Sequence, residues 1–381
     1  MGAEGADPAS SYRPTTLRPS LERAGHRHKI ALMSSVKVAR TTFDGRSARV
    51  VMDIAGDRVE ISLEANRRFR RPVAFGDVWL PLAIFPAMRL GVPVELADPV
   101  SSKRLEGVLE AQRVLAAWDD TLTPQAVRAP VTRRSPLRRR PPIQLMTGGV
   151  DSSFKLLEHP ETVDLLYVHD VLHEPPAVRE RVDQQLDSMA RALRRRVTKV
   201  DSDIRRVLDP YAEWGSQTHG AALVAAASLV AEGRRTLYVA GSHHYSDLEP
   251  WGSHPVLDHL YSSGTLRVVH SGAHATRPEK VRAVARDAVL TAHLRVCWRS
   301  TDALNCGRCE KCLRTMVALE LAGALGTATT FDVPLSLDAL RTIEIANESE
   351  RVFVLENIRA ARSAGRDDIA EALAVAVGAS P

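Results

Sequence analysis

Long apolar runs are absent from this 381-residue sequence: no stretch of about 18 apolar residues occurs, and the first 29 residues lack the apolar core of a secretory signal peptide. The first absence argues against a membrane-spanning helix, and the second argues against export. We therefore expect a cytoplasmic protein without a membrane partner. Residues 1–29 are expected to form a disordered leader, because they are rich in small and polar residues.

Acidic residues are missing from one arginine-rich stretch. Residues 128–140 hold six arginines and no Asp or Glu, and removing these six charges from the formal +5 of the chain leaves −1 for the rest. The positive charge is therefore local, which predicts a solvated, flexible linker at residues 121–141 rather than general nucleic-acid binding. A strip that contacts the phosphates of RNA or DNA remains the alternative.

Cysteine is scarce, and all four cysteines lie within sixteen residues, with eight, two and two residues between successive members. Four thiolates at this spacing suit a tetrahedral Zn²⁺ site with no open position, which is a structural site. Two disulfides are disfavoured in a chain without a signal peptide, and an iron–sulfur cluster is the other reading. Lys311 and Arg314 flank the cluster and are further candidates for a substrate cleft. The expected metal ligands are Cys297, Cys306, Cys309 and Cys312.

The N-terminal part of the chain predicts a small accessory α+β domain over residues 30–120. Residues 48–64 alternate in hydrophobicity around a central Gly-Asp pair, which is typical of a β-hairpin. Residues 77–91 are apolar, but their two prolines argue against one long regular helix. A strand is expected at residues 93–97 and a helix at residues 103–118. No catalytic motif occurs in this region.

From residue 142 onward, short apolar strands alternate with helices. Such alternation predicts a doubly wound parallel sheet with helices on both faces, and these sheets bind ligands at the carboxyl ends of their strands. We assign this α/β domain to residues 142–325 and expect a C-terminal helical extension over residues 326–381. The expected strands are residues 143–146, 164–169, 197–200, 236–240 and 266–270, and the expected helices include residues 178–195 and 217–232.

A glycine-rich turn follows the first of these strands, with the sequence Thr147-Gly148-Gly149-Val150-Asp151-Ser152-Ser153. Two glycines let the backbone approach a ligand, the start of the next helix offers unpaired N–H groups, and three hydroxyls can bond to phosphate oxygens. An acid beside phosphate is expected where Mg²⁺ lies between them, which suggests that role for Asp151. The alternative is a simple helix cap, because Thr, Asp and Ser all cap helices. No Gly-Lys-Ser/Thr follows, so the loop is not of the Walker A type.

This turn resembles the SGGxDS signature of the PP-loop (N-type) ATP pyrophosphatase superfamily, with Thr147 in place of the usual Ser. The spacing of the cysteines resembles the zinc motif of one member family, the 7-cyano-7-deazaguanine synthases. The resemblance covers roughly residues 142–325 and does not explain residues 1–140. It implies a fold of the adenine nucleotide alpha hydrolase type, the cofactors ATP, Mg²⁺ and Zn²⁺, and cleavage between the α and β phosphates. After the fourth strand, the family's Tyr-Pro-Asp-Cys-like stretch is missing, so we expect a different substrate.

Other candidate residues lie near the expected carboxyl ends of the strands. Gly241, Ser242 and His243 follow the fourth strand, and His243 is a candidate acid–base group. Arg277 and Lys280 stand at the start of a helix, where they either neutralise pyrophosphate or are ordinary solvated charges. The residues assigned to catalysis are Asp151, Ser152 and His243. The residues assigned to ATP are Thr147, Gly148, Gly149, Val150, Asp151, Ser152, Ser153, Val168, Gly241, Ser242, Arg277 and Lys280.

The expected function is that of an ATP-dependent ligase or synthase that forms AMP and pyrophosphate. A carboxylate or amide oxygen of the substrate would attack the α-phosphate, and a nitrogen nucleophile would then displace AMP, with catalysis by positioning and electrostatics. The partner is a small-molecule substrate or a macromolecule that is modified, and a homodimer is an open alternative to a monomer. A non-catalytic ATP-binding regulatory protein and an RNA-modifying enzyme of the same superfamily remain the rival functions.

Overall fold

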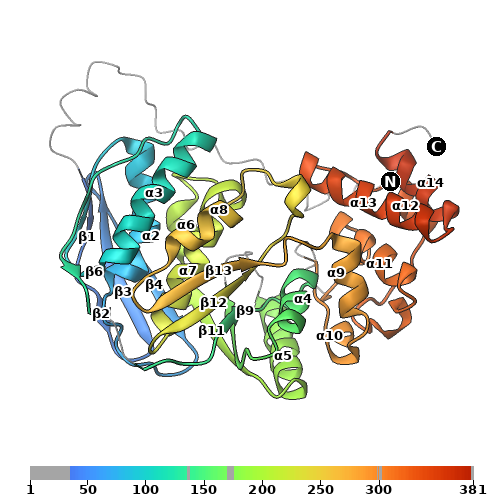
Figure 1. Ribbon diagram of the computed structural model, residues 1–381, viewed down its shortest axis with the longest axis horizontal. Helices are drawn as coiled ribbons and strands as arrows, with labels where there is room; N and C mark the ends of the chain where they lie inside the picture. The colour runs from blue at the N-terminus through green and yellow to red at the C-terminus, as the bar shows by residue number, and fades with distance from the viewer. Residues whose placement is uncertain (1–34, 135–137, 170–175, 298, 300–302, 379–381) are drawn as a thin grey trace, which may run out of the picture. The chain divides into compact units, whose positions relative to one another are not determined.

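The computed structural model describes residues 35–134, 138–169, 176–297, 299 and 303–378, and these residues form an eleven-stranded sheet and a small two-stranded one (Figure 1). The large sheet has the order β13-β12-β9-β10-β11-β4-β3-β1-β5-β7, with β2 paired to β3, and the small one pairs β6 with β8. The strands are β1 (Val36–Val38), β2 (Thr42–Phe43), β3 (Ser47–Ile54), β4 (Asp57–Ala65), β5 (Val94–Leu96), β6 (Val100–Ser101), β7 (Val127–Arg128), β8 (Val131–Thr132), β9 (Ile143–Leu145), β10 (Asp164–Val168), β11 (Arg196–Ser202), β12 (Arg235–Ala240) and β13 (Leu266–Ser271).

Five neighbouring strands, β13, β12, β9, β10 and β11, run parallel. The chain enters this part of the sheet at its centre, in β9, continues through β10 to β11 on one side, and then returns to β12 and β13 on the other side. In a sheet of this kind ligands bind outside the carboxyl ends of the strands, at the point where the strand order reverses, which here lies between β9 and β12. The prediction of an α/β fold with a mostly parallel central sheet is confirmed.

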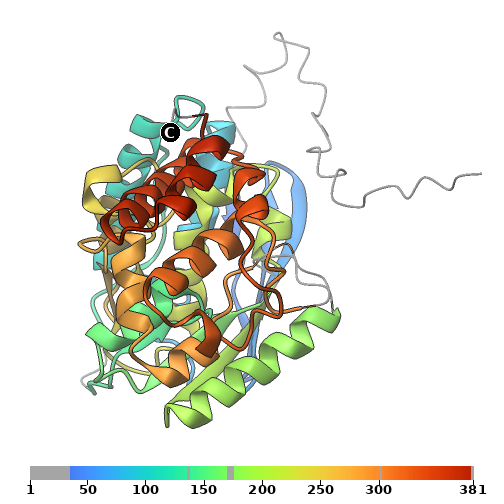
Figure 2. The same ribbon diagram turned by 90° about the vertical axis from the view of Figure 1, so that its right-hand side faces the viewer.

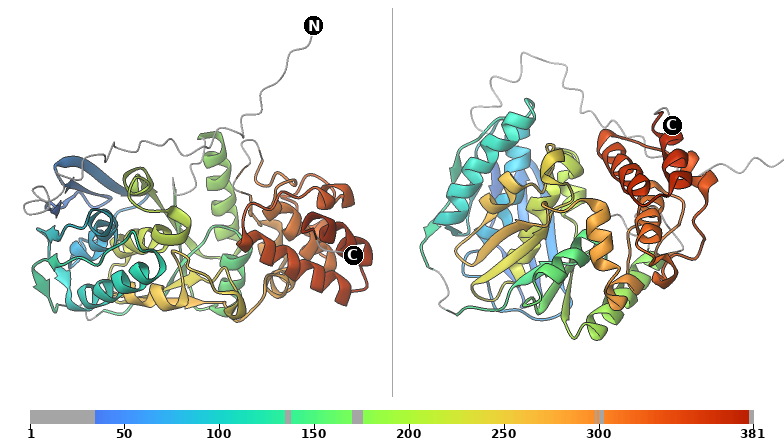
Figure 3. Two further views of the ribbon diagram at one scale, coloured as in Figure 1. Left: turned by 90° about the horizontal axis from the view of Figure 1, so that it is seen from above. Right: turned by 45° about the vertical axis from the view of Figure 1, so that its right-hand side comes forward.

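Helices cover both faces of this sheet (Figure 3). On one face α2, α3 and α7 contribute to a hydrophobic core that includes Trp79 and Leu237, and on the other face α4, α5 and α9 pack around Leu165 and Val182. No helix among the described residues is long and apolar enough to cross a membrane. The helices are α2 (Gly76–Leu90), α3 (Ser102–Trp118), α4 (Val150–Glu158), α5 (Pro176–Ala192), α6 (Ile204–Leu208), the π-helical turn η2 (Trp214–Thr218), α7 (His219–Val230), α8 (Pro255–Asp258), α9 (Arg277–Val284), α10 (Ala288–Ala292), α11 (Glu310–Leu321), α12 (Leu337–Arg341), α13 (Glu348–Ser363) and α14 (Asp367–Ala376).

The sheet continues without a break into the N-terminal part of the chain. β4 pairs antiparallel with β11, with Ala65 opposite Val200, and β3 and β4 form the hairpin expected within residues 48–64. Gly56 in the hairpin turn has φ +107°, a conformation that glycine adopts without strain. The region expected as an accessory domain therefore shares both its sheet and its core with the region that begins at residue 142.

Helix α2 resolves the uncertainty that two prolines placed on a long regular helix at residues 77–91. Pro81 and Pro86 both lie inside the 15-residue helix, which ends where Gly91 adopts φ +72°. A proline inside a helix costs about 3 kcal/mol through its missing hydrogen bond and its ring clash. Thirteen of the fifteen residues are buried, among them Trp79 and Phe85. Burial of a large aromatic or aliphatic side chain contributes about 1.5–3 kcal/mol, so tertiary packing outweighs the cost of both prolines.

The segment expected as a flexible linker is partly ordered into strands. β7 and β8 lie in it, and they pair with β5 and β6 respectively. Nearer its end, Arg139 forms a β-bridge with Arg234, immediately before β9 begins. The linker is therefore corrected to a segment that adds strands to both sheets, because its backbone finds partners that its polar composition does not reveal.

The C-terminal helices form a further cluster around α11 (Figure 2). Leu313 of α11, Val354 of α13 and Leu373 of α14 belong to one buried core. Helix α13 also contacts α9, which follows β13. The extension after the α/β region is thus packed against the helices that lie closest to the reversal point of the sheet.

Candidate functional site

The turn that follows β9 has a fixed backbone conformation. Gly148 has φ +77°, which favours glycine, and its carbonyl accepts a hydrogen bond from the backbone N–H of Arg295 at 2.9 Å. Helix α4 begins directly after Gly149, and no side chain caps it. The N–H groups of its first turn therefore lack an intrahelical partner and lie at the positive end of the helix dipole. This arrangement is suited to an anion.

The three hydroxyls of the turn differ in what they contact. Ser152 Oγ donates to the Gly149 carbonyl at 3.0 Å and lies 3.3 Å from Thr147 Oγ1, so these two hydroxyls support the turn itself. Ser153 is buried, and its hydroxyl has no hydrogen-bond partner within the described part of the chain. Among the three, the Ser153 hydroxyl is thus the one that retains its full capacity for a ligand. The catalytic assignment of Ser152 stays a prediction.

Asp151 is held by two cations that lie more than 120 residues away in the sequence. Its carboxylate is 2.9 Å from the Arg277 guanidinium and 3.2 Å from Lys280 Nζ. Lys280 also donates to the Gly241 carbonyl at 2.6 Å, which joins the ends of β9 and β12. Both cations project from the first turn of α9, whose N-cap Thr276 forms a capping box with Glu279 in the same turn. The fold therefore brings the predicted residues 151, 241, 277 and 280 together at the reversal point.

The electrostatics of this cluster keep the Asp151 carboxylate ionised. Burial raises the pKa of Asp151, but Arg277, Lys280 and Arg314 outweigh burial and lower the pKa to about 2. Burial lowers the pKa of Lys280, and Asp151 acts against that shift. The cations are almost fully buried, with 7% of Arg277 and 1% of Lys280 exposed, so the alternative that they are solvated surface charges is excluded.

Two further cations come from α11. Arg314 forms an ion pair with Glu310 at 3.1 Å, and its guanidinium lies 4.1 Å from the centroid of the Phe353 ring. Burial lowers the pKa of Arg314 to about 10 and that of Lys311 to about 8. We refer to Arg277, Lys280, Lys311 and Arg314 together as the basic cluster. Arg277, Lys280 and Arg314 are buried and Lys311 is half-buried, so an anion that enters the cluster would meet several cations in a poorly solvated environment.

His243 lies under aromatic rings beside the basic cluster. Its ring centroid is 5.4 Å from that of Phe353 and 5.7 Å from that of Trp251, and its Nε2 is 3.4 Å from Ser349 Oγ. Burial and then Arg277 lower the pKa of His243 to about 4. The imidazole is therefore neutral near pH 7, so it can accept a proton there but carries none to give as an acid.

The remaining predicted residues, Gly241, Ser242 and Val168, lie at the carboxyl ends of β12 and β10. Gly241 accepts the hydrogen bond from Lys280, and Ser242 follows it at the carboxyl end of β12. Val168 ends β10, and with 3% exposure its side chain belongs to the core shared with α2 and α7. A nucleotide could therefore reach Val168 through its backbone but not through its side chain.

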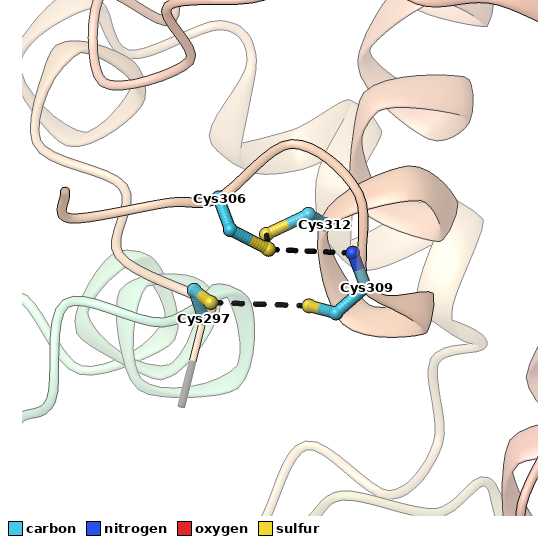
Figure 4. Close-up of side chains that lie close together, drawn as sticks. All are labelled: Cys297, Cys306, Cys309 and Cys312. Carbon is cyan, nitrogen blue, oxygen red and sulfur yellow. Dashed lines mark hydrogen bonds between the residues drawn. The ribbon is translucent and has the colours of Figure 1, made fainter. Parts of the chain in front are cut away.

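The four cysteines form a compact cluster of free thiols (Figure 4). Their Sγ atoms all lie within 4.8 Å of one another, with 3.9 Å from Cys297 to Cys309 and 3.8 Å from Cys306 to Cys312. The backbone N–H of Cys309 donates to Cys306 Sγ at 3.3 Å. Hydrogen bonds from its neighbours lower the pKa of Cys297, and its thiolate in turn raises the pKa of Cys309 to about 12. Four ligand atoms at this spacing could hold one metal ion.

Comparison with known proteins adds no relative. No family model matches the chain, and no curated protein or solved structure matches it.

The cysteine cluster is joined to the turn after β9 by short connections. Arg295, which donates to the Gly148 carbonyl, stands two residues before Cys297. On the other side, Cys309 is the N-cap of α11, which carries Arg314 into the basic cluster. Asn305 fixes the segment that carries Cys297, because its side-chain oxygen accepts the backbone N–H of Cys297 at 3.1 Å. A metal held by the cysteines would therefore order both the turn and the basic cluster.

Sequence reasoning missed the contribution of α13 to this site. Glu356 accepts the backbone N–H of Arg277 at 3.1 Å, and Asn357 Nδ2 donates to the Arg314 carbonyl at 2.8 Å. Phe353 covers both Arg314 and His243. No motif surrounds these residues in the sequence. Their spacing was the one sequence signal for them, because it places Phe353, Glu356 and Asn357 on one face of an amphipathic helix.

Proposed function

We propose that this chain is an ATP-dependent enzyme that adenylates its substrate and releases pyrophosphate. The observation that carries the proposal is the Asp151 carboxylate, held between Arg277 and Lys280 beside the uncapped start of α4. These groups stand at the reversal point of a parallel sheet, where nucleotides commonly bind. The match to the SGGxDS signature and the absence of a Walker lysine favour cleavage at the α-phosphate over γ-phosphate transfer.

The residues present fit a triphosphate with its metal. The first-turn N–H groups of α4 and the orphaned hydroxyl of Ser153 offer hydrogen bonds, and the buried Nε of Arg277 also has no partner among the described residues. The basic cluster would hold the phosphates and neutralise charge that develops on the pyrophosphate. Mg²⁺ would bind Asp151, which is ionised at neutral pH and is released from its two cations when phosphate oxygens take them.

The chain's own groups would then position the reactants rather than form a covalent intermediate. The substrate is a carboxylate or an amide whose oxygen attacks the α-phosphate, and a nitrogen nucleophile later displaces AMP. His243 is neutral and lies next to the basic cluster, so its unprotonated ring nitrogen could accept a hydrogen bond from that nitrogen, although a pKa of about 4 makes it a weak base at pH 7. The four cysteines would hold Zn²⁺ in a closed tetrahedral site, which supplies folding free energy and leaves no thiol for sulfur transfer.

Product analysis tests this proposal directly. The full chain is incubated with Mg²⁺, ATP, ammonium and a panel of carboxylic acids, and the spent nucleotide is separated by chromatography. We expect AMP and pyrophosphate, and ADP with phosphate as the sole products would refute the assignment. Asp151→Asn should lower AMP formation by at least about a hundredfold, since it removes both the Mg²⁺ ligand and the partner of two cations. Asp57→Asn, at the exposed first position of β4, is the matched control and should keep full turnover. ATP binding without turnover by the wild type would instead indicate a regulatory protein.

A further inference from the structure

Arginines from four separate segments meet at the amino edge of the parallel strands, opposite the candidate site. One segment follows β4, and the others lead into β9, β11 and β12. Because β9, β11 and β12 belong to one parallel set, their amino ends lie along the same edge, and β4 runs antiparallel to β11 so that its carboxyl end joins them. The arginines are Arg67, Arg68, Arg70, Arg71, Arg138, Arg139, Arg140, Arg194, Arg195, Arg196, Arg234 and Arg235, which we call the arginine edge.

Two carboxylates show that these segments are in contact. Glu232 lies 3.8 Å from Arg67 and 3.7 Å from Arg140, and it also accepts the backbone N–H of Arg70 at 3.2 Å. Asp164 lies 2.6 Å from Arg196 and 2.5 Å from the buried Arg235. The backbone of Arg234 pairs with the segment before β9. The arginine edge is thus one continuous surface rather than four isolated charge runs.

Positive charge on this surface is far from balanced. Glu161, Asp164 and Glu232 are the carboxylates of the loops that lead into β10 and β12, against twelve arginines. Seven of the arginines are exposed and form no ion pair with any described residue: Arg68, Arg70, Arg71, Arg138, Arg139, Arg194 and Arg234. Since the whole chain carries only +5, the remainder of the chain is net negative. A surface this basic on a chain otherwise acidic concentrates positive potential along one edge.

We propose that the arginine edge binds the phosphate backbone of a nucleic acid. Guanidinium groups present paired N–H donors that match phosphate oxygens, and a row of them follows a polyanion better than a single anion. A membrane surface fits less well, because Val73 is the one exposed large apolar side chain within residues 66–73, 138–142, 193–196 and 232–235, so little of these segments could insert into lipid. Contacts to phosphate carry no sequence information, so we expect binding to be independent of sequence. It does not depend on the proposed adenylating activity.

Salt-dependent binding tests the inference. Fluorescein-labelled single-stranded RNA, duplex RNA and duplex DNA of 25 nucleotides or base pairs are titrated with the full chain between 50 and 200 mM salt, and the preferred form identifies the natural ligand. The edge variant carries Arg70→Gln, Arg138→Gln, Arg139→Gln and Arg234→Gln. The control variant carries Arg40→Gln, Arg58→Gln, Arg286→Gln and Arg359→Gln, which remove the same charge from exposed positions elsewhere. We expect the edge variant to lose at least about tenfold in affinity and about 3 units of the salt slope, and the control to stay within about twofold.

A second measurement covers the case in which the edge variant does not fold. Wild-type protein is treated with phenylglyoxal, which modifies exposed arginines, with and without the RNA or DNA probe, and the modified sites are mapped by mass spectrometry. Protection concentrated at Arg70, Arg138, Arg139 and Arg234 supports the proposal. Equal loss of binding in both variants, protection spread over the whole surface, or binding to phosphatidylserine vesicles but to no nucleic acid would overturn it.

Discussion

At the scale of one residue, Lys155 is a buried charge beside the candidate site that lowers the stability of the folded protein. It lies on α4 beneath the turn, it is fully buried, and its Nζ has no hydrogen-bond partner among the described residues. Burial lowers its pKa to about 8, and Lys280 adds to that shift. The folded protein therefore holds a lysine that would lose its proton more readily than a lysine in water.

Replacing this lysine should stabilise the protein in a pH-dependent manner. Because the folded pKa of about 8 lies below the unfolded value, the unfolded chain binds the extra proton, and the stability cost is full below pH 8. The cost disappears as the pH rises toward about 10.4, the pKa of a free lysine. Lys155→Met should raise the free energy of unfolding by up to about 3 kcal/mol at pH 7 and by little at pH 10.

Urea unfolding at pH 7, 8.5 and 10 measures this difference. Lys37→Met, an exposed lysine on β1, is the control and should show no comparable trend with pH. A gain in stability that stays constant from pH 7 to pH 10 would mean that Lys155 keeps the pKa of a free lysine in the folded state, as a lysine paired with an acid would.

At the scale of the element, α11 links the cysteines to the basic cluster. Cys309 caps the helix, Cys312 lies in its first turn, and Arg314 follows half a turn later. Without a metal, the cysteines at the first turn of α11 would be held to Cys297 and Cys306 by thiol hydrogen bonds alone. Metal binding is thus expected to order Arg314 as well as the cysteines.

Loss of one ligand should consequently release the metal and loosen the nucleotide site together. We expect about one equivalent of Zn²⁺ in protein purified without added metal, and less than about a tenth of that in Cys309→Ser. The variant should unfold at a lower temperature and bind ATP more weakly, while Asp151→Asn should retain its zinc. Elemental analysis with thermal unfolding measures both effects. Iron with acid-labile sulfide would show a different metal on the same four ligands.

Helix α13 supplies the second element-scale prediction, through Phe353. This ring covers Arg314 and His243, so Phe353→Ala should raise the KM for ATP several-fold and raise the pKa of His243 by exposing it to water. Phe69→Ala is a matched control, because Phe69 is also 6% exposed and also lies under an arginine. Both variants should lose about 3 kcal/mol of stability, and only Phe353→Ala should change the KM or the pH profile. Equal KM values in the two variants would confine α13 to a structural role.

At the scale of the whole molecule, the shared sheet determines which parts can fold alone. β4 covers the edge of β11, and α2 packs against α7, so removing residues 35–134 would expose an unpaired strand and an apolar helix face. We expect residues 138–378 alone to be insoluble or to lack cooperative unfolding, whereas the full chain unfolds in one transition. Expression trials report the solubility of the fragment, and thermal unfolding followed by circular dichroism reports whether it unfolds cooperatively. A soluble fragment with a sharp transition would show that the N-terminal strands are dispensable.

The same scale explains what the sequence could predict. Alternating apolar strands and the Gly-Gly-Val-Asp turn are local patterns, so the parallel strands, the position of Asp151 and the cysteine cluster were all within reach. The pairing of β4 with β11 and the contact of Glu356 with Arg277 join residues 79 or more positions apart, and neither leaves a local pattern. A long helix at α2 was in doubt because the helix-breaking tendency of proline can be read from the local sequence. The burial of α2 that offsets this tendency depends on tertiary packing, which the local sequence does not show.

The five parallel strands separate two charged edges of the molecule by their own length. At about 3.3 Å per residue, a strand of five to seven residues holds its ends about 17–23 Å apart. That separation exceeds the Debye length of about 8 Å at physiological salt, so the exposed arginines interact only weakly through solvent with charges at the other edge. A polyanion along the arginine edge and a nucleotide beside Asp151 would therefore occupy the protein simultaneously, each with an affinity insensitive to the other.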